Sequence, residues 1–215
     1  MRNLNTPILP GLFLAALPGW VVAADPGTQS WHFTVLLDGK RIGQHDFVIR
    51  RQGDEVVAEN VAHFKVGVAF IPLYAYDHEN HEIWRGGCVT EVSSRTNDNG
   101  HKLFVQGALE GEVFEVKGSR GALRLPGCVR TFAYWDLGLI SAPPLLNTQT
   151  GELQAVSVTA GGVQNIRAGG KTLAATRYLL RAPHLAIDAR YSAAGDWVAL
   201  ESKLEGGRML RYALQ

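Results

Sequence analysis

The densest cluster of side chains that could bind a metal or move a proton is Asp-His-Glu-Asn-His-Glu, residues 77–82. A zinc protease places two histidines on one helical face with the spacing H-E-x-x-H. Here His78 and His81 lie on a predicted strand, where positions three apart point to opposite faces. One metal could not readily take both, and a metal site would instead need His78 with Glu82 or Asn80 and ligands from neighbouring strands. We predict no metal and no other cofactor, and interpret the cluster as a polar strand face that is solvated or lines a pocket.

Other catalytic signatures are missing from the sequence. There is no G-x-S-x-G motif, and no strand–helix–strand pattern that would hold such a nucleophile. We interpret the glycine pairs as hairpin turns and not as phosphate-binding loops, because none is followed by a helix with Lys and Ser or Thr. A hydrolase with a site near His78, Glu82 or Asp136 remains a third hypothesis for the function.

Aromatic residues share a strand face with part of the polar cluster. Alternation along residues 73–84 puts Tyr74, Tyr76 and Trp84 on the same face as His78 and Glu82. If this face points into a cavity, it forms an apolar pocket with polar anchors, as in most ligand sites. In a packed core, Glu82 would need a hydrogen-bonding partner. On the outside, the aromatic rings would form an exposed interaction patch.

A second apolar region interrupts the pattern of strands and turns between Cys128 and Gly151. It contains an aromatic cluster, Phe132, Tyr134 and Trp135. Pro143-Pro144 then breaks regular structure, and the polar run 147–151 favours turns. We predict a crossover packed on the core, with a short helix at Tyr134–Ser141. It is either a hydrophobic plug or a segment whose aromatic rings and Asn147-Thr148-Gln149 line the mouth of a pocket.

The rest of the chain reads as short strands separated by turns. Asp38-Gly39 and Asn99-Gly100 are strong hairpin signals, because these residues tolerate the positive φ that tight hairpins need. No stretch sustains a helical apolar period beyond about two turns. The spacing indicates an all-β antiparallel barrel or sandwich, with a first meander at 30–126, the crossover at 127–151 and a second meander at 152–215.

The N-terminus has the pattern of a secretory signal peptide. Arg2 precedes an apolar run over residues 7–22, and Val22-Ala23-Ala24 supplies small residues before a cleavage site. We expect cleavage after Ala24, or after Ala23, and a single exported periplasmic β domain over residues 25–215 with no transmembrane span. The formal net charge is +1, and no basic block suggests a nucleic-acid partner.

The two cysteines, Cys88 and Cys128, both follow the predicted leader. In an oxidising compartment an even count favours a disulfide. A bridge closing a loop of about 40 residues would stabilise the fold by roughly 4 kcal/mol in the chain-entropy model. Two separate buried thiols are the alternative. The pair is not C-x-x-C, so a thioredoxin-like redox role is not supported.

Several motifs together resemble a family of exported bacterial proteins, domain-of-unknown-function family 6134. They are L-D-G-K-x-I-G at 37–43, Y-x-Y-D-H-x-N-x-E-x-W at 74–84, F-A-Y-W-D with L-L-N-T-Q-T-G within 132–151, and Y-x-x-x-G-x-W-V at 191–198. The resemblance spans nearly all of the chain after the leader. It implies a periplasmic antiparallel β protein and brings no reaction and no catalytic residues. By analogy of fold alone, we expect a half-barrel or barrel-like sheet similar to those of lipoprotein carriers.

The leading functional hypothesis is a non-enzymatic protein that binds a hydrophobic ligand, such as a lipid or an acyl chain, in a β cavity. The predicted ligand-binding residues are Tyr74, Tyr76, His78, Glu82, Trp84, Phe132, Tyr134, Trp135 and Asn147. His78 and Asn147 would anchor a polar head group. The second hypothesis is a structural or assembly module that contacts another envelope protein.

Overall fold

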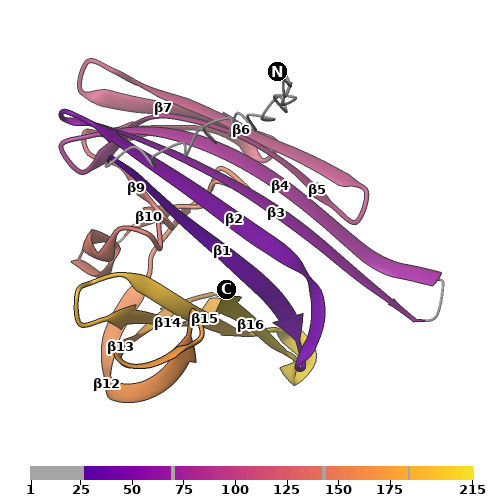
Figure 1. Ribbon diagram of the computed structural model, residues 1–215. Coiled ribbons are helices and arrows are strands. Elements are labelled where there is room, and N and C mark those ends of the chain that lie inside the picture. The colour runs from indigo at the N-terminus through magenta and orange to yellow at the C-terminus, as the bar shows by residue number, and fades with distance from the viewer. Residues whose placement is uncertain (1–26, 69–70, 142–143, 184) are drawn as a thin grey trace, which may run out of the picture.

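The computed structural model describes residues 27–68, 71–141, 144–183 and 185–215 (Figure 1). The predicted signal peptide, residues 1–24, lies outside the described residues. Regular structure in the described part of the chain consists of strands and two short 3-10 turns.

The first part of the chain forms eight strands in succession. They are β1 (Thr28–Leu37), β2 (Lys40–Gln52), β3 (Glu55–Val68), β4 (Ile71–Arg85), β5 (Cys88–Asp98), β6 (His101–Glu110), β7 (Val113–Gly118) and β8 (Gly121–Pro126). The crossover, which continues in the structure to Gln154, then contributes three short strands and one 3-10 turn: β9 (Arg130–Thr131), η1 (Leu137–Ser141), β10 (Leu145–Leu146) and β11 (Leu153–Gln154). The last part adds β12 (Ser157–Ala168), β13 (Lys171–Ala182), β14 (Leu185–Ser192), β15 (Trp197–Lys203), η2 (Glu205–Gly207) and β16 (Met209–Leu214).

The two meanders join into one antiparallel sheet of 13 strands, ordered β12-β13-β14-β15-β16-β1-β2-β3-β4-β5-β6-β7-β8. The junction is the pairing of β1 with β16, in which Val35 lies opposite Tyr212. The sheet curls strongly, so that β12–β16 lie across from β2–β5 (Figure 1). Its edge strands, β8 and β12, do not pair with each other. This open, barrel-like sheet confirms the predicted fold class.

Two hairpins show why the sequence turns where it does. Asp38 and Asn99 adopt φ values of 50° and 51°, and the following Gly39 and Gly100 adopt 82° and 93°. Consecutive positive φ angles match the right-handed twist of the flanking strands, and Asp or Asn before Gly tolerates them best. The predicted Asp-Gly and Asn-Gly turns therefore join β1 to β2 and β5 to β6.

The crossover, with β9 and β10, packs inside the curl of the sheet (Figure 1). Cys88 at the start of β5 and Cys128 form the predicted disulfide, with 5.0 Å between the Cα atoms. Beside it, the amide of Val89 donates to the carbonyl of Val129 at 2.9 Å. Leu139, Leu145 and Leu146 of the crossover are almost wholly buried in the main core. The crossover thus fills much of the concave side.

The predicted helix at Tyr134–Ser141 is only a 3-10 turn, η1, over its last five residues. Asp136 begins this turn, because its Oδ1 accepts a hydrogen bond from the amide of Gly138 at 3.0 Å and its Oδ2 one from Arg130 at 3.1 Å. Tyr134 and Trp135 instead form a turn, in which the amide of Asp136 donates to the carbonyl of Ala133 at 2.9 Å, and both side chains pack against the main core.

Candidate functional site

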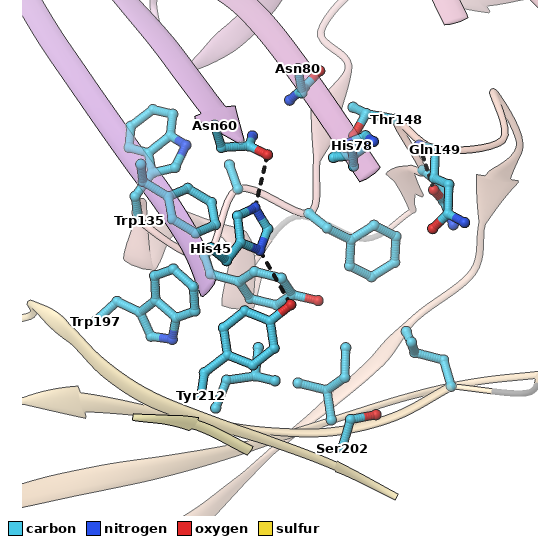
Figure 2. A pocket seen from close by; sticks show the side chains of 18 of the residues that line it. His45, Asn60, His78, Asn80, Trp135, Thr148, Gln149, Trp197, Ser202 and Tyr212 are labelled. Atoms are coloured by element: carbon cyan, nitrogen blue, oxygen red, sulfur yellow. Dashed lines mark hydrogen bonds between the residues drawn. The ribbon is translucent and has the colours of Figure 1, made fainter. Parts of the chain in front are cut away.

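A cavity of about 240 Å³ lies between the crossover and the concave side of the sheet. Its apolar wall comes from β2, the crossover and β14–β16: Phe47, Phe132, Ala133, Tyr134, Trp135, Leu185, Ile187, Trp197, Leu200 and Leu210. Polar groups gather on β2–β4 and on the turn after β10: His45, Asn60, Tyr76, His78, Asn80, Glu82, Asn147, Thr148 and Gln149. The cavity therefore has an apolar wall and a polar one (Figure 2).

His45 bridges the two sides of the curled sheet (Figure 2). Its Nε2 lies 3.0 Å from Oδ1 of Asn60 on β3, and its Nδ1 lies 3.2 Å from the hydroxyl of Tyr212 on β16. A neutral ring satisfies both contacts, with Nε2–H donating to Asn60 and Tyr212 donating to Nδ1. Burial lowers the pKa of His45 to about 4. The imidazole is therefore neutral near neutral pH and acts as an uncharged connector.

Alternate residues of β4 make up the polar wall. Tyr76, His78, Asn80 and Glu82 point the same way because strand positions two apart share a face. We call these four residues, with Trp84, the inner face of β4. His78 is 7% exposed, and its Nδ1 lies 2.8 Å from the Thr96 hydroxyl of β5. Burial lowers the pKa of His78 to about 4, so this ring is also neutral near neutral pH.

Glu82 is a buried carboxyl whose hydrogen bonds come from neutral donors. Its Oε1 accepts from Nδ2 of Asn80 at 2.8 Å, and its Oε2 accepts from Nε1 of Trp84 at 2.7 Å and from the Thr131 hydroxyl at 3.1 Å. Burial raises the pKa of Glu82 above its usual range, while these three hydrogen bonds act in the opposite direction. Thr131 belongs to β9, so Glu82 also fastens the crossover to the sheet.

The turn after β10 forms the rim of the cavity. Asn147 organises it, because its Oδ1 accepts from the amide of Gln149 at 2.8 Å and its carbonyl accepts from the amide of Gly151 at 2.8 Å. The Ser94 hydroxyl of β5 donates to the carbonyl of Thr148, and the Tyr76 hydroxyl donates to Oε1 of Gln149 at 3.3 Å. The rim is therefore held in place by the inner face of the sheet.

A family model, described as Domain of unknown function (DUF6134), matches residues 33–215. The chain belongs to the DUF6134 family. This match confirms the resemblance seen in the sequence motifs. No curated protein matches the DUF6134 chain.

The fold of the DUF6134 chain has a counterpart among solved structures. A crystal structure titled as a beta-barrel-like protein of domain of unknown function DUF1849, from Brucella abortus, superposes with a TM-score of 0.63. The match covers 86% of this chain and 94% of that chain at 13% sequence identity. The two proteins are similar in fold. No helix in the described part of the DUF6134 chain is long and apolar enough to cross a membrane.

Most of the predicted ligand-binding residues of the DUF6134 chain lie around the cavity described above. They are Tyr76, His78, Glu82, Phe132, Tyr134, Trp135 and Asn147. Tyr74 and Trp84 are not among the lining residues. The Tyr74 hydroxyl donates to Asp98 at 2.8 Å, and Trp84, 2% exposed, packs edge-on against Trp135 with ring centroids 5.4 Å apart. The binding roles of all nine residues stay predictions.

The three residues of the hydrolase hypothesis do not form one constellation. His78 hydrogen-bonds to Thr96, whereas Glu82 accepts from Asn80, Trp84 and Thr131. Asp136 binds Arg130 and does not line the cavity. Within the described residues, no group of three or more His, Cys, Asp or Glu side chains is placed to hold a metal.

Sequence reasoning missed four conspicuous lining residues: His45, Asn60, Trp197 and Tyr212. His45 and Phe47 alternate with polar residues on β2, so their shared face was readable from the sequence. Tyr212 approaches them only because β16 pairs with β1. That pairing joins residues far apart in sequence, and no local pattern signals it.

Proposed function

We propose that this protein is a non-enzymatic periplasmic binder of a hydrophobic ligand, such as a lipid or an acyl chain, which occupies the cavity. The observation that carries the proposal is the cavity itself, with aromatic and aliphatic residues on one wall and a few polar groups on the other. Ligand sites in proteins commonly have this composition. At about 240 Å³ the cavity is slightly smaller than most ligand pockets, which have volumes of roughly 300–1,000 Å³. This size favours a ligand with a single acyl chain or a single ring system.

The preformed walls support binding rather than passive packing. Tyr212 and Asn60 hold His45, Thr96 contacts His78, and Tyr76 holds the rim through Gln149. Side chains that are already ordered lose little conformational entropy when a ligand binds. A cavity kept open by its own hydrogen bonds therefore favours affinity for an apolar molecule.

The compartment is part of the proposal. The predicted signal peptide at residues 1–24 directs export, and the Cys88–Cys128 disulfide is compatible with an oxidising compartment such as the periplasm. Amphiphilic molecules that cross the space between two membranes need an apolar shelter from water. A protein with an inward-facing apolar cavity provides one.

Titration with the neutral fluorescent probe N-phenylnaphthylamine tests the proposal. We expect saturable binding to the wild type and loss of most of the affinity in Ser202→Phe, because Ser202 is a buried lining residue and the added ring would fill the cavity. Ser93→Phe is the matched control, since Ser93 is exposed and faces away from the cavity. Absence of saturable binding, or equal affinity of the two variants, would reject the cavity as the binding site.

A further inference from the structure

Asn80 occupies the middle of the polar wall. On the sheet it lies opposite Asn60 of β3 on one side and Ser94 of β5 on the other. Its side chain is directed to the cavity from the inner face of β4 (Figure 2). The residue is 6% exposed, so its amide group is largely shielded from bulk water.

The amide of Asn80 uses only one of its hydrogen-bonding sites. Nδ2 donates to Oε1 of Glu82, but Oδ1 is fully buried and has no partner among the described residues. The large majority of buried side-chain polar atoms in folded proteins have a partner, from the protein or from ordered water. An orphaned carbonyl oxygen on a residue that lines a cavity is therefore an acceptor that a ligand donor can satisfy after a small shift of the side chain.

The groups around this oxygen are suited to an uncharged partner. The carboxyl of Glu82 already accepts three hydrogen bonds, and both ring nitrogens of His45 are engaged. No Lys, Arg or Asp is among the described residues that line the cavity. A carboxylate, phosphate or ammonium head would lose its hydration there without meeting an opposite free charge, which is unfavourable.

Asn60 supplies the complementary group. Its Oδ1 accepts from His45, whereas its Nδ2 donates to no other described residue. Asn60 also faces Asn80 directly across the β3–β4 ladder. Side by side, a free amide N–H and a free amide oxygen match the carbonyl and the N–H of a carboxamide.

Building on the proposed function, we infer that the ligand is an uncharged amphiphile whose polar end carries an N–H or O–H donor, and that this donor binds Oδ1 of Asn80. A carboxamide satisfies both Asn80 and Asn60, and an alcohol satisfies Asn80 through its hydroxyl. The apolar tail lies against the aromatic wall around Trp135 and Trp197.

Calorimetric titration with a series of probes that share an eight-carbon chain tests this inference at neutral pH. The probes are octanamide, octan-1-ol, methyl octanoate, octanoate and octylamine. We expect octanamide to bind roughly ten-fold more tightly than methyl octanoate, which can accept but cannot donate. Octan-1-ol should lie between them, and the two ions should bind more weakly than octanamide.

A variant ties the preference to Asn80. Asn80→Leu keeps the approximate shape and removes the acceptor, so the affinity ratio of octanamide to methyl octanoate should fall to about one. The control Asn165→Leu, at an exposed position of β12, should keep the wild-type ratio. If Asn80→Leu does not fold, the probe series on the wild type still decides the question.

The outcomes separate the two proposals. If no probe binds, the proposed apolar-ligand function fails. If the probes bind but octanamide and methyl octanoate bind equally, water satisfies Oδ1 of Asn80 and the inference alone is overturned. Tightest binding of octylamine would also overturn it, because Glu82 rather than Asn80 would then select the head group.

Discussion

The two faces of β4 carry similar side chains in opposite environments. On the inner face, His78 and Glu82 are 7% and 3% exposed and bind neutral partners. On the outer face, Glu79 is exposed, and the His81 side chain, 46% exposed, lies 3.4 Å from Glu59. The type of a residue on β4 therefore says little about how much it contributes to the stability of the protein. The face of the strand on which a histidine or glutamate lies decides whether it lines the cavity or lies exposed on the surface.

The largest expected difference between the faces is in stability. Glu82→Ala leaves buried donors of Asn80, Trp84 and Thr131 without their acceptor, each at a cost of roughly 1–3 kcal/mol, partly offset by the removal of a desolvated carboxyl. We expect a loss of about 4 kcal/mol in the free energy of unfolding, measured by urea denaturation. Glu79→Ala, its outer-face match, should change stability by less than about 0.5 kcal/mol. Similar losses for both would contradict the comparison.

A smaller difference is expected in the response to acid. The pKa of His78 is about 4 in the folded protein and 6.5 in the unfolded chain, so the unfolded chain takes up the proton first as pH falls. The stabilisation is complete above pH 6.5 and is lost toward pH 4, by roughly 3 kcal/mol. Unfolding curves between these pH values should show a shallower decline in His78→Asn than in the wild type.

His81→Asn is the outer-face control for the acid experiment. Its exposed pair with Glu59 is worth at most about 1 kcal/mol, so this variant should keep most of the wild-type decline. His45, whose pKa is also about 4, adds a decline of the same sign in every variant. The raised pKa of Glu82 acts with the opposite sign, because that stabilisation is present at low pH and is lost as pH rises. Both contributions cancel in the difference between His78→Asn and the wild type. Equal declines in His78→Asn and His81→Asn would refute the assignment of the acid-dependent loss of stability to His78.

Local patterns in the sequence were enough to predict the all-β class and several of the turns of this fold. Turns at Asp38-Gly39 and Asn99-Gly100 and the alternation of β4 depend on residues close in sequence, and each was readable. The disulfide could be predicted because only two cysteines exist. The helix expected at Tyr134–Ser141 shrank to a 3-10 turn, because packing of the aromatic side chains on the sheet outweighed the local apolar pattern.

The composition of the cavity could be predicted only in part. The alternation of β4 grouped Tyr76, His78 and Glu82 correctly on one face. It could not show that Tyr74 and Trp84, at the two ends of the same face, lie beyond the cavity. That limit is set by sheet curvature and by the depth to which the crossover packs, and both depend on contacts between distant segments.

Native mass spectrometry of the protein purified from cells without lipid extraction tests the central claim most directly. We predict a species heavier than the disulfide-bonded chain by one small apolar molecule, lost after organic extraction and diminished in Ser202→Phe but not in Ser93→Phe. A spectrum with only the bare chain, unchanged after incubation with N-phenylnaphthylamine or octanamide, would contradict the account.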